Sequence, residues 1–276
     1  MSLQKSIHSP VQTDIFSMAY SDVLMRDVRE TIEVPFFSLS RRPQFEPIEY
    51  ERHGIEVRVT SSHPLGIATI WDWDLMMWLV SQIRYTLDLG LPVSRRIRFS
   101  RIAFLRDVRR NVSMGEHKRL KATIERLRTT QVRTSIRAPR GKLSIDFNWL
   151  EHAETESDGD DVFQETWVVI PEWLFDAVID KGQVLTLPRN YFLLNGGLER
   201  WFYRFIRRQA GINKSGWRWK MNTLYERSGS PCAYRYFARD LRQIIDKKHL
   251  LDYELSGEDI GSESYVSARR IQPKNH

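Results

Sequence analysis

Residues 113–136, SMGEHKRLKATIERLRTTQVRTSI, contain the pattern on which the fold prediction rests. Ser113 stands before a helical pattern and Glu116 follows three positions later, which is the spacing of an N-terminal capping box. An apolar stripe recurs at helical spacing, at Leu120, Ile124 and Leu127. Branched residues favour a strand from Val132 to Ile136. The stretch therefore predicts a helix that ends near Thr129 and a strand directly after it.

The opposite face of this predicted helix is basic. Its positive side chains flank small residues that permit close approach to another molecule: Lys118, Arg119, Lys121 and Arg126. A helix of this kind, second in a helix-turn-helix, enters the DNA major groove, where arginine reaches guanine edges and lysine reaches phosphates. A solvated helix rich in lysine and arginine gives the same pattern. Because Lys118 and Arg126 lie off the apolar stripe, replacing either is predicted to weaken DNA binding and to leave stability nearly unchanged.

The elements around this helix fit one known arrangement. Before it we predict a strand at 55–60, a core helix at 74–89, a strand at 96–99 and a helix capped by Ser100. After it, turn chemistry at 138–141 and alternation at 143–147 predict a hairpin. The order helix, strand, helix, helix, hairpin is that of a winged helix-turn-helix. The hairpin tip is predicted to bring three basic side chains to a minor groove or to flanking phosphates: Arg137, Arg140 and Lys142.

The second half of the sequence repeats this order of elements. Strands are predicted at 184–187 and 217–221, helices at 198–210, 222–227 (capped by Asn222) and 233–248, and a hairpin that pairs 252–255 with 265–269. The long helix at 233–248 has an aromatic face and an opposite basic face with Arg235, Arg239, Arg242 and nearby Gln243. Two basic helices at equivalent places favour DNA binding over a merely solvated face. The second hairpin has an acidic tip at 257–259 and is predicted to make no phosphate contact.

The predicted fold class is α+β, with two tandem winged-helix (winged helix-turn-helix) domains. Residues 1–34 show weak periodicity, and we assign them to an N-terminal arm. The repeated order of elements assigns residues 35–153 to the first domain and 184–276 to the second. The connecting segment, 154–183, begins with an acidic stretch at 154–161. We predict a solvated loop there because its charges repel one another. A strand and a short helix opened by Pro171 complete the connection.

Composition limits the classes of function. The 276 residues carry a formal net charge of +7, which favours a polyanionic partner such as DNA. No apolar run approaches the roughly 18 residues of a membrane-spanning helix, and the start of the sequence lacks a secretion pattern, so we expect a cytoplasmic protein without membrane contact. Cys232 is the only cysteine, which excludes a disulfide or a thiolate zinc site within this chain. We expect Cys232 to be buried.

Enzyme signatures are absent from the sequence. Gly141 and Lys142 lack the upstream glycine of a phosphate-binding loop and are followed by leucine. The paired-histidine metal motif of rolling-circle nicking enzymes is also missing. We therefore expect no catalytic activity, no cofactor and no metal. The tryptophans at 71–78 and Trp201 are expected to pack in the core rather than to stack on bases.

Several collinear segments resemble the replication initiator protein A family of plasmids. They are residues 66–72 (GIATIWD), 117–136, 184–192, 198–200 (LER) and 224–230. Together they span roughly residues 35–255, and the resemblance lies in their series rather than in one diagnostic motif. It implies binding to repeated double-stranded DNA sites at a plasmid origin, opening of the adjacent duplex, and recruitment of the host initiator and the replicative helicase. It also implies a possible homodimer that represses its own gene, and it supplies no catalytic residues.

Two other functions remain open at this point. A winged-helix transcriptional regulator shares the architecture, and differs in that its binding does not melt origin DNA. A nicking or primase-like replication enzyme instead carries out Mg²⁺-dependent strand cleavage or synthesis.

Overall fold

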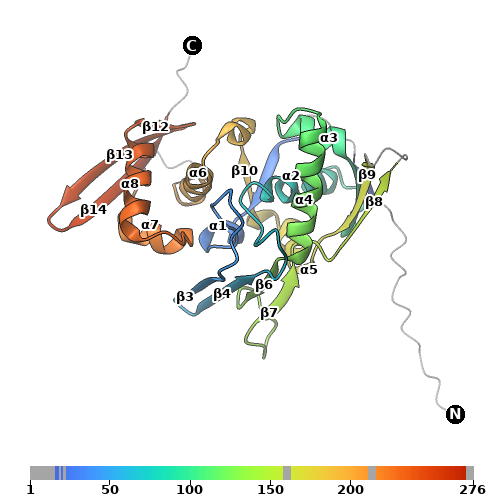
Figure 1. Cartoon of the computed structure of the whole chain (residues 1–276), viewed down its shortest axis with the longest axis horizontal. Coiled ribbons are helices and arrows are strands. Elements are labelled where there is room, and N and C mark those ends of the chain that lie inside the picture. Colours follow the sequence, from blue (N-terminus) through green and yellow to red (C-terminus); the bar gives the residue numbers. More distant parts are fainter. Residues whose placement is uncertain (1–15, 19, 21–22, 158–162, 211–215, 272–276) are drawn as a thin grey trace.

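The computed structural model describes residues 16–18, 20, 23–157, 163–210 and 216–271 (Figure 1). This part of the chain mixes helices with antiparallel-rich sheets, which confirms the predicted α+β class. The strands are β1 (Phe16–Met18), β2 (Met25–Val28), β3 (Ile48–Arg52), β4 (Ile55–Thr60), β5 (Arg96–Ser100), β6 (Gln131–Thr134), β7 (Ile145–Asn148), β8 (His152–Ser157), β9 (Phe163–Val169), β10 (Val184–Leu187), β11 (Trp217–Lys220), β12 (His249–Leu250), β13 (Tyr253–Ile260) and β14 (Glu263–Arg270). The helices are α1 (Glu30–Glu33), α2 (Trp73–Asp88), α3 (Arg101–Asp107), α4 (Met114–Thr129), α5 (Glu172–Ile179), α6 (Gly197–Gln209), α7 (Met221–Ser228) and α8 (Tyr234–Ile245), with 3-10 turns η1 (Lys181–Gln183) and η2 (Arg189–Leu193).

The described strands form four sheets that surround the central helices. Their strand orders are β1-β5-β9-β8, β10-β2, β3-β4-β6-β7 and β11-β14-β13-β12. In Figure 1 the sheet that contains β13 and β14 lies at one end of the molecule and the strands β8 and β9 lie at the other. Helices α2, α4 and α6 lie between these ends.

Helix α2 is the centre of the core. Its side chains are buried on every side over most of its length, and Trp78, Leu79 and Ile83 are completely inaccessible to solvent. A helix that is buried on every side must be enclosed by other elements, and β2, α3 and α5 pack against α2. The expected burial of the tryptophans is confirmed for Trp73, Trp78 and Trp201, whereas Trp71 is half-buried.

The helix start signals that the sequence predicts are present in the structure. Ser100 accepts a hydrogen bond from the Ala103 amide at 3.5 Å, and Ser113 accepts one from the Glu116 amide at 3.3 Å. Each serine therefore satisfies an amide that the first turn of its helix leaves unpaired. The predicted apolar stripe of α4 is buried: Leu120, Ile124 and Leu127.

The first half differs from the predicted arrangement in its strand pairing. β6 and β7 form a hairpin that continues the sheet of β3 and β4, so Val132 lies opposite both Val59 and Phe147. The strand between α2 and α3 is β5, and it pairs with β9 and, in parallel, with β1. This strand and the hairpin therefore belong to different sheets.

In the second half the corresponding strand and hairpin share one sheet. β11 pairs with β14, and β14 pairs with β13, all antiparallel. The hairpin is longer than predicted and turns at Gly261, whose φ of +60° is easily reached only without a side chain. The prediction that Asn222 caps α7 is wrong, because α7 begins at Met221 and the Asn222 side chain donates to Glu226 within the helix at 2.8 Å.

The predicted N-terminal arm, residues 1–34, is wrong for residues 16–18, which form β1 beside β5, and from residue 23 onward. β2 and α1 lie in the core, and β2 pairs antiparallel with β10, which places Val28 opposite Val184. The strand is short and contains the charged Asp27, so hydrophobic periodicity does not reveal it. Because β10 pairs with β2, the domain boundary predicted at residue 184 falls inside a sheet. Residues 1–15, 19 and 21–22 of the predicted arm lie outside the described residues.

The acidic segment also differs from its prediction. Residues 152–157 form β8, which pairs antiparallel with β9. Alternation along the strand leaves Glu154 exposed and Ala153 half-buried, so the charge stays in solvent while the backbone is paired. The prediction of a loop is therefore wrong for residues 154–157, and residues 158–161 lie outside the described part of the chain.

Two buried arginines of α6 join the second half of the chain to the first. Arg204 Nε donates to Asp27 Oδ2 at 2.6 Å, and the Trp73 indole N–H donates to the same carboxylate at 2.9 Å. Arg200 Nη1 donates to Asp74 Oδ1 at 2.6 Å. Because removing charges from water is costly, buried ion pairs are stable only when further hydrogen bonds complete them. These bonds fix α6 against α2 and β2.

Candidate nucleic-acid interface

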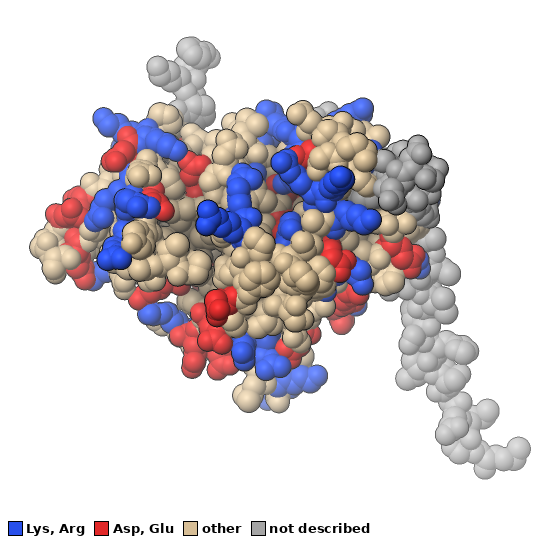
Figure 2. All heavy atoms as spheres, in the orientation of Figure 1, with Lys and Arg blue, Asp and Glu red and all other residues tan. Residues whose placement is uncertain are grey.

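Helix α4 presents a basic face to solvent. Lys118, Arg119 and Lys121 are exposed, while the opposite stripe of the helix is buried. Arg119 forms an ion pair with Glu116 and still keeps 74% of its side chain exposed. Figure 2 shows lysine and arginine side chains gathered over α4. The structure therefore places these three residues on one accessible surface.

Arg126 does not belong to that exposed face. Its Nε and Nη2 donate to the two oxygens of Asp72 at 2.7 and 2.6 Å, and only 20% of its side chain is exposed. Burial lowers the pKa of Arg126, but the hydrogen bond and the charge of Asp72 outweigh burial and raise it above its ordinary value. The expectation that Arg126 lies free on the helix surface is wrong. Asp72 is distant in sequence, so the helical wheel cannot show this partner.

The first hairpin carries only part of its predicted basic tip. Arg140 and Lys142 are exposed in the turn between β6 and β7. Arg137 instead folds back onto α5, where it donates to the Trp173 carbonyl at 2.5 Å and pairs with Glu30 at 2.9 Å. Its guanidinium lies 4.3 Å from the Trp173 ring centroid, and burial lowers its pKa. The prediction that Arg137 lies at the hairpin tip is therefore wrong.

Helix α8 carries a second basic face. The predicted residues are all exposed: Arg235, Arg239, Arg242 and Gln243. Their guanidinium groups contact only surface partners, at 4.6 Å from the Tyr236 ring centroid for Arg235, 2.7 Å from Asp240 for Arg239 and 2.9 Å from Ser264 Oγ for Arg242. α4 and α8 both face the viewer in Figure 1, and Figure 2 shows basic side chains over each. The two faces therefore lie on the same side of the molecule.

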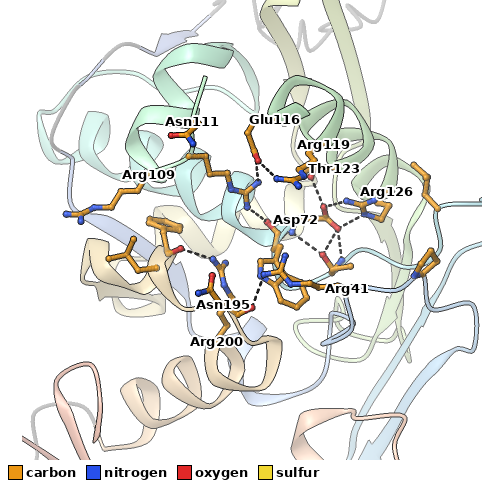
Figure 3. Close-up of a pocket in the computed structure, with 17 residues that line it drawn as sticks. Arg41, Asp72, Arg109, Asn111, Glu116, Arg119, Thr123, Arg126, Asn195 and Arg200 are labelled. Carbon is orange, nitrogen blue, oxygen red and sulfur yellow. Dashed lines mark hydrogen bonds and ion pairs between the residues drawn. The ribbon is translucent and has the colours of Figure 1, made fainter. Parts of the chain in front are cut away.

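A pocket that the sequence does not predict adjoins α4. It has a volume of about 590 Å³ and lies between α4, the α3–α4 loop, the loop at 41–43 and the segment between η2 and α6 (Figure 3). Six arginines line it, and we call it the arginine pocket: Arg41, Arg109, Arg110, Arg119, Arg126 and Arg200. These arginines come from separate parts of the chain, so no local sequence pattern connects them.

Carboxylates beneath the pocket hold most of these arginines in place. Asp74 accepts from Arg110 and from Arg200, each at 2.6 Å, and is itself completely buried. Glu116 pairs with Arg119 and lies 4.0 Å from Arg110. Because each carboxylate is shared or already paired, its charge is neutralised by arginines that the fold positions.

Arg41 differs from the other arginines at the centre of the pocket. Its guanidinium lies 4.3 Å from the ring centroid of Trp71 and donates one hydrogen bond, at 2.9 Å, to the carbonyl of Asn195. Within the described residues no carboxylate pairs with it. Burial lowers the pKa of Arg41, and so do the charges of nearby arginines, of which Arg200 has the largest effect. The pocket therefore carries positive charge that its own acids do not balance.

Other candidate chemistry is limited in the described residues. Cys232 is exposed, so the expectation that it is buried is wrong; it lies at the surface just before α8 begins. Across the described ranges, no group of three or more His, Cys, Asp or Glu side chains is arranged to hold a metal ion. None of the helices in those ranges is long and apolar enough to cross a membrane.

Known proteins resemble this chain in sequence or in fold. A protein of Wigglesworthia glossinidia brevipalpis named "Putative replication protein" is 25% identical over 230 residues, which are 82% of this chain and 82% of that protein. Two crystal structures of domains 2 and 3 of RctB have a similar fold, with TM-scores of 0.65 and 0.59. Each is 14% identical in sequence; they cover 88% and 85% of this chain, and 97% and 95% of the RctB chains.

The family assignment rests on the sequence itself. At 14% identity the RctB structures show a shared fold alone. The family described as Replication initiator protein A matches residues 26–255, which is most of the chain and includes Asp27 of β2, the residue that binds Arg204. The chain therefore belongs to the Replication initiator protein A family.

Proposed function

We propose that this protein initiates plasmid replication by binding repeated double-stranded DNA sites at an origin in a sequence-specific manner. Family membership supports a role in replication initiation. The observation that carries DNA binding is the exposure of two basic helix faces, on α4 and α8, on one side of the molecule (Figure 2). Two helices on one side can contact a single duplex together, which turns the second contact into an intramolecular event with a high effective concentration.

In this proposal each half acts as a winged-helix module. The helix pairs are α3 with α4 and α7 with α8, and the second helix of each pair enters the major groove. The sheet that joins β11 to the β13–β14 hairpin supports this interpretation for the second half. In the first half, Arg140 and Lys142 at the β6–β7 turn contact flanking phosphates. Arg126 and Arg137 make no DNA contact in this proposal, and they stabilise the fold through their ion pairs with Asp72 and Glu30.

The proposed function has further parts, which the match to a family of replication initiators supports only in part. The bound protein opens the adjacent duplex and recruits the host initiator and the replicative helicase. It acts in the cytoplasm, where plasmid DNA is replicated, and it has no catalytic activity, cofactor or metal of its own. A homodimer binds where two repeats face each other, because a two-fold protein matches a palindromic site.

The first experiment selects DNA fragments from the source replicon and footprints the full chain on them. Lys118→Ala/Lys121→Ala should lower the slope of log K against log salt by about two, since each lost phosphate contact removes about 0.9. Arg235→Ala/Arg239→Ala/Arg242→Ala should shorten the footprint on one side. Lys181→Ala is the matched control, because its side chain is 80% exposed on η1. Unchanged footprints and slopes in both multiple variants would exclude the two-helix interface.

A second measurement separates an initiator from a transcriptional regulator. On supercoiled origin DNA the protein should make thymines next to the repeats reactive to permanganate, which attacks unstacked bases. A regulator protects its site without this reactivity. If repeats are bound with high specificity and no adjacent thymine becomes reactive, the proposed opening of the origin is wrong.

A further inference from the structure

The arginine pocket contains more positive charge than its carboxylates neutralise. Six arginines line it, and three carboxylates pair with four of them: Asp72, Asp74 and Glu116. Six positive and three negative charges leave three unbalanced positive charges in a cavity of about 590 Å³. A concave site with fixed, unbalanced charge attracts an anion more strongly than a flat surface does, because its walls focus the field.

The pocket is also arranged so that two guanidinium groups remain available. Arg41 lies over the Trp71 ring and donates one hydrogen bond to the Asn195 carbonyl, which leaves most of its N–H donors without a partner among the described residues. Arg119 reaches the same pocket from α4 and has 74% of its side chain exposed. Figure 3 shows both side chains among the residues that line the pocket, Arg119 from α4 and Arg41 from the loop on the other side of Asp72. The planar fork of arginine matches the oxygens of a phosphate.

We propose that the arginine pocket binds a phosphate group, with Arg41 and Arg119 as its direct ligands. Arg110 and Arg200 are positioning residues, since Asp74 holds them in place below the opening. The phosphate has two sources of the same chemistry: the backbone of a bound duplex or a free phosphoryl compound. In the first case the inference rests on the proposed function, because the pocket then extends the DNA contact of α4.

The position of the pocket favours the duplex as the source. Arg119 lies on α4 between Lys118 and Lys121, so the pocket opens beside the basic face of the helix. A helix in the major groove has a phosphate backbone along each flank, and contacts to that backbone fix its position. A phosphate held by Arg41 would therefore set how deeply and at what angle α4 enters the groove.

The test compares Arg41→Ala with Lys181→Ala, which removes the same charge from a distant exposed site. In the DNA arm, each phosphate of the selected site is replaced in turn by a neutral methylphosphonate. Arg41→Ala should lower the salt slope by about 0.9 and weaken binding nearly tenfold at 0.1 M salt. One methylphosphonate that weakens the wild type should have no effect on Arg41→Ala. Arg41→Lys, which keeps the charge without the fork, should recover the slope and lose part of the affinity.

In the second arm, calorimetric titration with pyrophosphate at constant ionic strength measures binding of a free phosphoryl compound. Binding to the wild type and to Lys181→Ala, but not to Arg41→Ala, with an unchanged DNA salt slope, supports the proposal with a free ligand as the source. If Arg41→Ala behaves like Lys181→Ala in both arms while its circular dichroism shows a native fold, the proposal is overturned.

Failure of the proposed function gives a different result. In that case the wild type selects no DNA, or Lys118→Ala/Lys121→Ala keeps full DNA binding. The pyrophosphate titration alone then tests whether the arginine pocket binds phosphate. Binding that depends on Arg41 supports the phosphate site, and the absence of binding overturns it.

Discussion

One buried carboxylate, Asp72, determines which arginines of α4 are available to a ligand. Besides its two bonds from Arg126, it accepts from Thr123 Oγ1 at 2.7 Å and from the Thr69 amide at 2.7 Å. The network joins α4 to the start of α2, and every member of it is bonded. Arg126 therefore positions α4, while Lys118 on the open face has no such role.

Arg126→Ala should destabilise the protein substantially, contrary to the interpretation of the helix surface from sequence. Removing one partner of a buried pair leaves the other charge unbalanced, which should lower the free energy of unfolding by about 3 kcal/mol. Lys118→Ala should change it by less than about 0.5 kcal/mol, because exposed side chains contribute little. Urea unfolding of both variants measures this difference. Equal midpoints and slopes for the two variants would contradict it.

At the scale of elements, the first residue of α6 lies unusually close to the rest of the fold. A Cβ on Gly197 would lie 2.0 Å from the Leu39 carbonyl oxygen and 2.9 Å from the Trp71 ring. This approach lets α6 reach α2 and fixes the loop that carries Arg41. Gly115 in the first turn of α4 is different, because a Cβ there would meet nothing nearer than Ser113 Oγ at 3.8 Å.

Two glycine substitutions should therefore have opposite effects on stability. Gly197→Ala should destabilise the fold by displacing α6 or the loop at residue 39, since backbone cannot yield as a side chain tip does. Gly115→Ala should stabilise it by roughly 0.5–1 kcal/mol, because alanine loses less backbone entropy in a helix. Thermal unfolding of the two variants provides the comparison, and destabilisation by Gly115→Ala or stabilisation by Gly197→Ala would each contradict it.

Glu199, also at the start of α6, should make stability depend on pH. Burial raises the pKa of Glu199, but its bonds to Lys247 and to the Gly196 amide outweigh burial and hold it below 4.5. A carboxyl group whose pKa is lower in the folded state stabilises the fold above its unfolded pKa and loses this effect as the pH falls through the folded value.

The stability difference between wild type and Glu199→Gln should therefore be greatest near neutral pH and should shrink as the pH falls below 4.5, toward the lowered pKa of the folded state. Lys247→Met should show the same pH dependence, because it removes the partner of Glu199, which lies just after α8. Urea unfolding from pH 3 to pH 7 measures both curves. A difference that is constant over this range would contradict the assignment to Glu199.

At the scale of the whole molecule, the two halves share one core. β10 from the second half completes a sheet with β2, and the buried pairs Arg204–Asp27 and Arg200–Asp74 cross between the halves. We expect a single unfolding transition in calorimetry, with equal calorimetric and van't Hoff enthalpies. Residues 184–276 expressed alone should lack a native near-ultraviolet circular dichroism spectrum. Two separate transitions would show that the halves fold independently.

The sequence predicts the elements whose signals are local. Caps and periodicity locate α2, α3, α4 and α8, and the exposed residues of α4 and α8 follow from the helical wheel. The features that the sequence does not predict depend on contacts between residues that are far apart in the chain. From the sequence, Asp27 is interpreted as a polar residue of an arm, because its partner Arg204 is far away in the chain. Arg126 is interpreted as a surface residue for the same reason, because its partner Asp72 lies outside the helix. The arginine pocket is hidden for the same reason.

The pairing of β2 with β10 also has a consequence for synthesis on the ribosome. The ion pair of Asp27 cannot form until Arg204, which is 177 positions later in the chain, has been synthesised. At about 5–20 residues per second, that delay is roughly 10–35 s. For most of this interval α5, one of the elements that pack against α2, has not yet been synthesised, and apolar surface left uncovered in this way makes a folding intermediate prone to aggregation. The core of this protein is therefore completed only after α6 has been synthesised, so a nascent chain that stops before Arg204 lacks the partner of its buried Asp27.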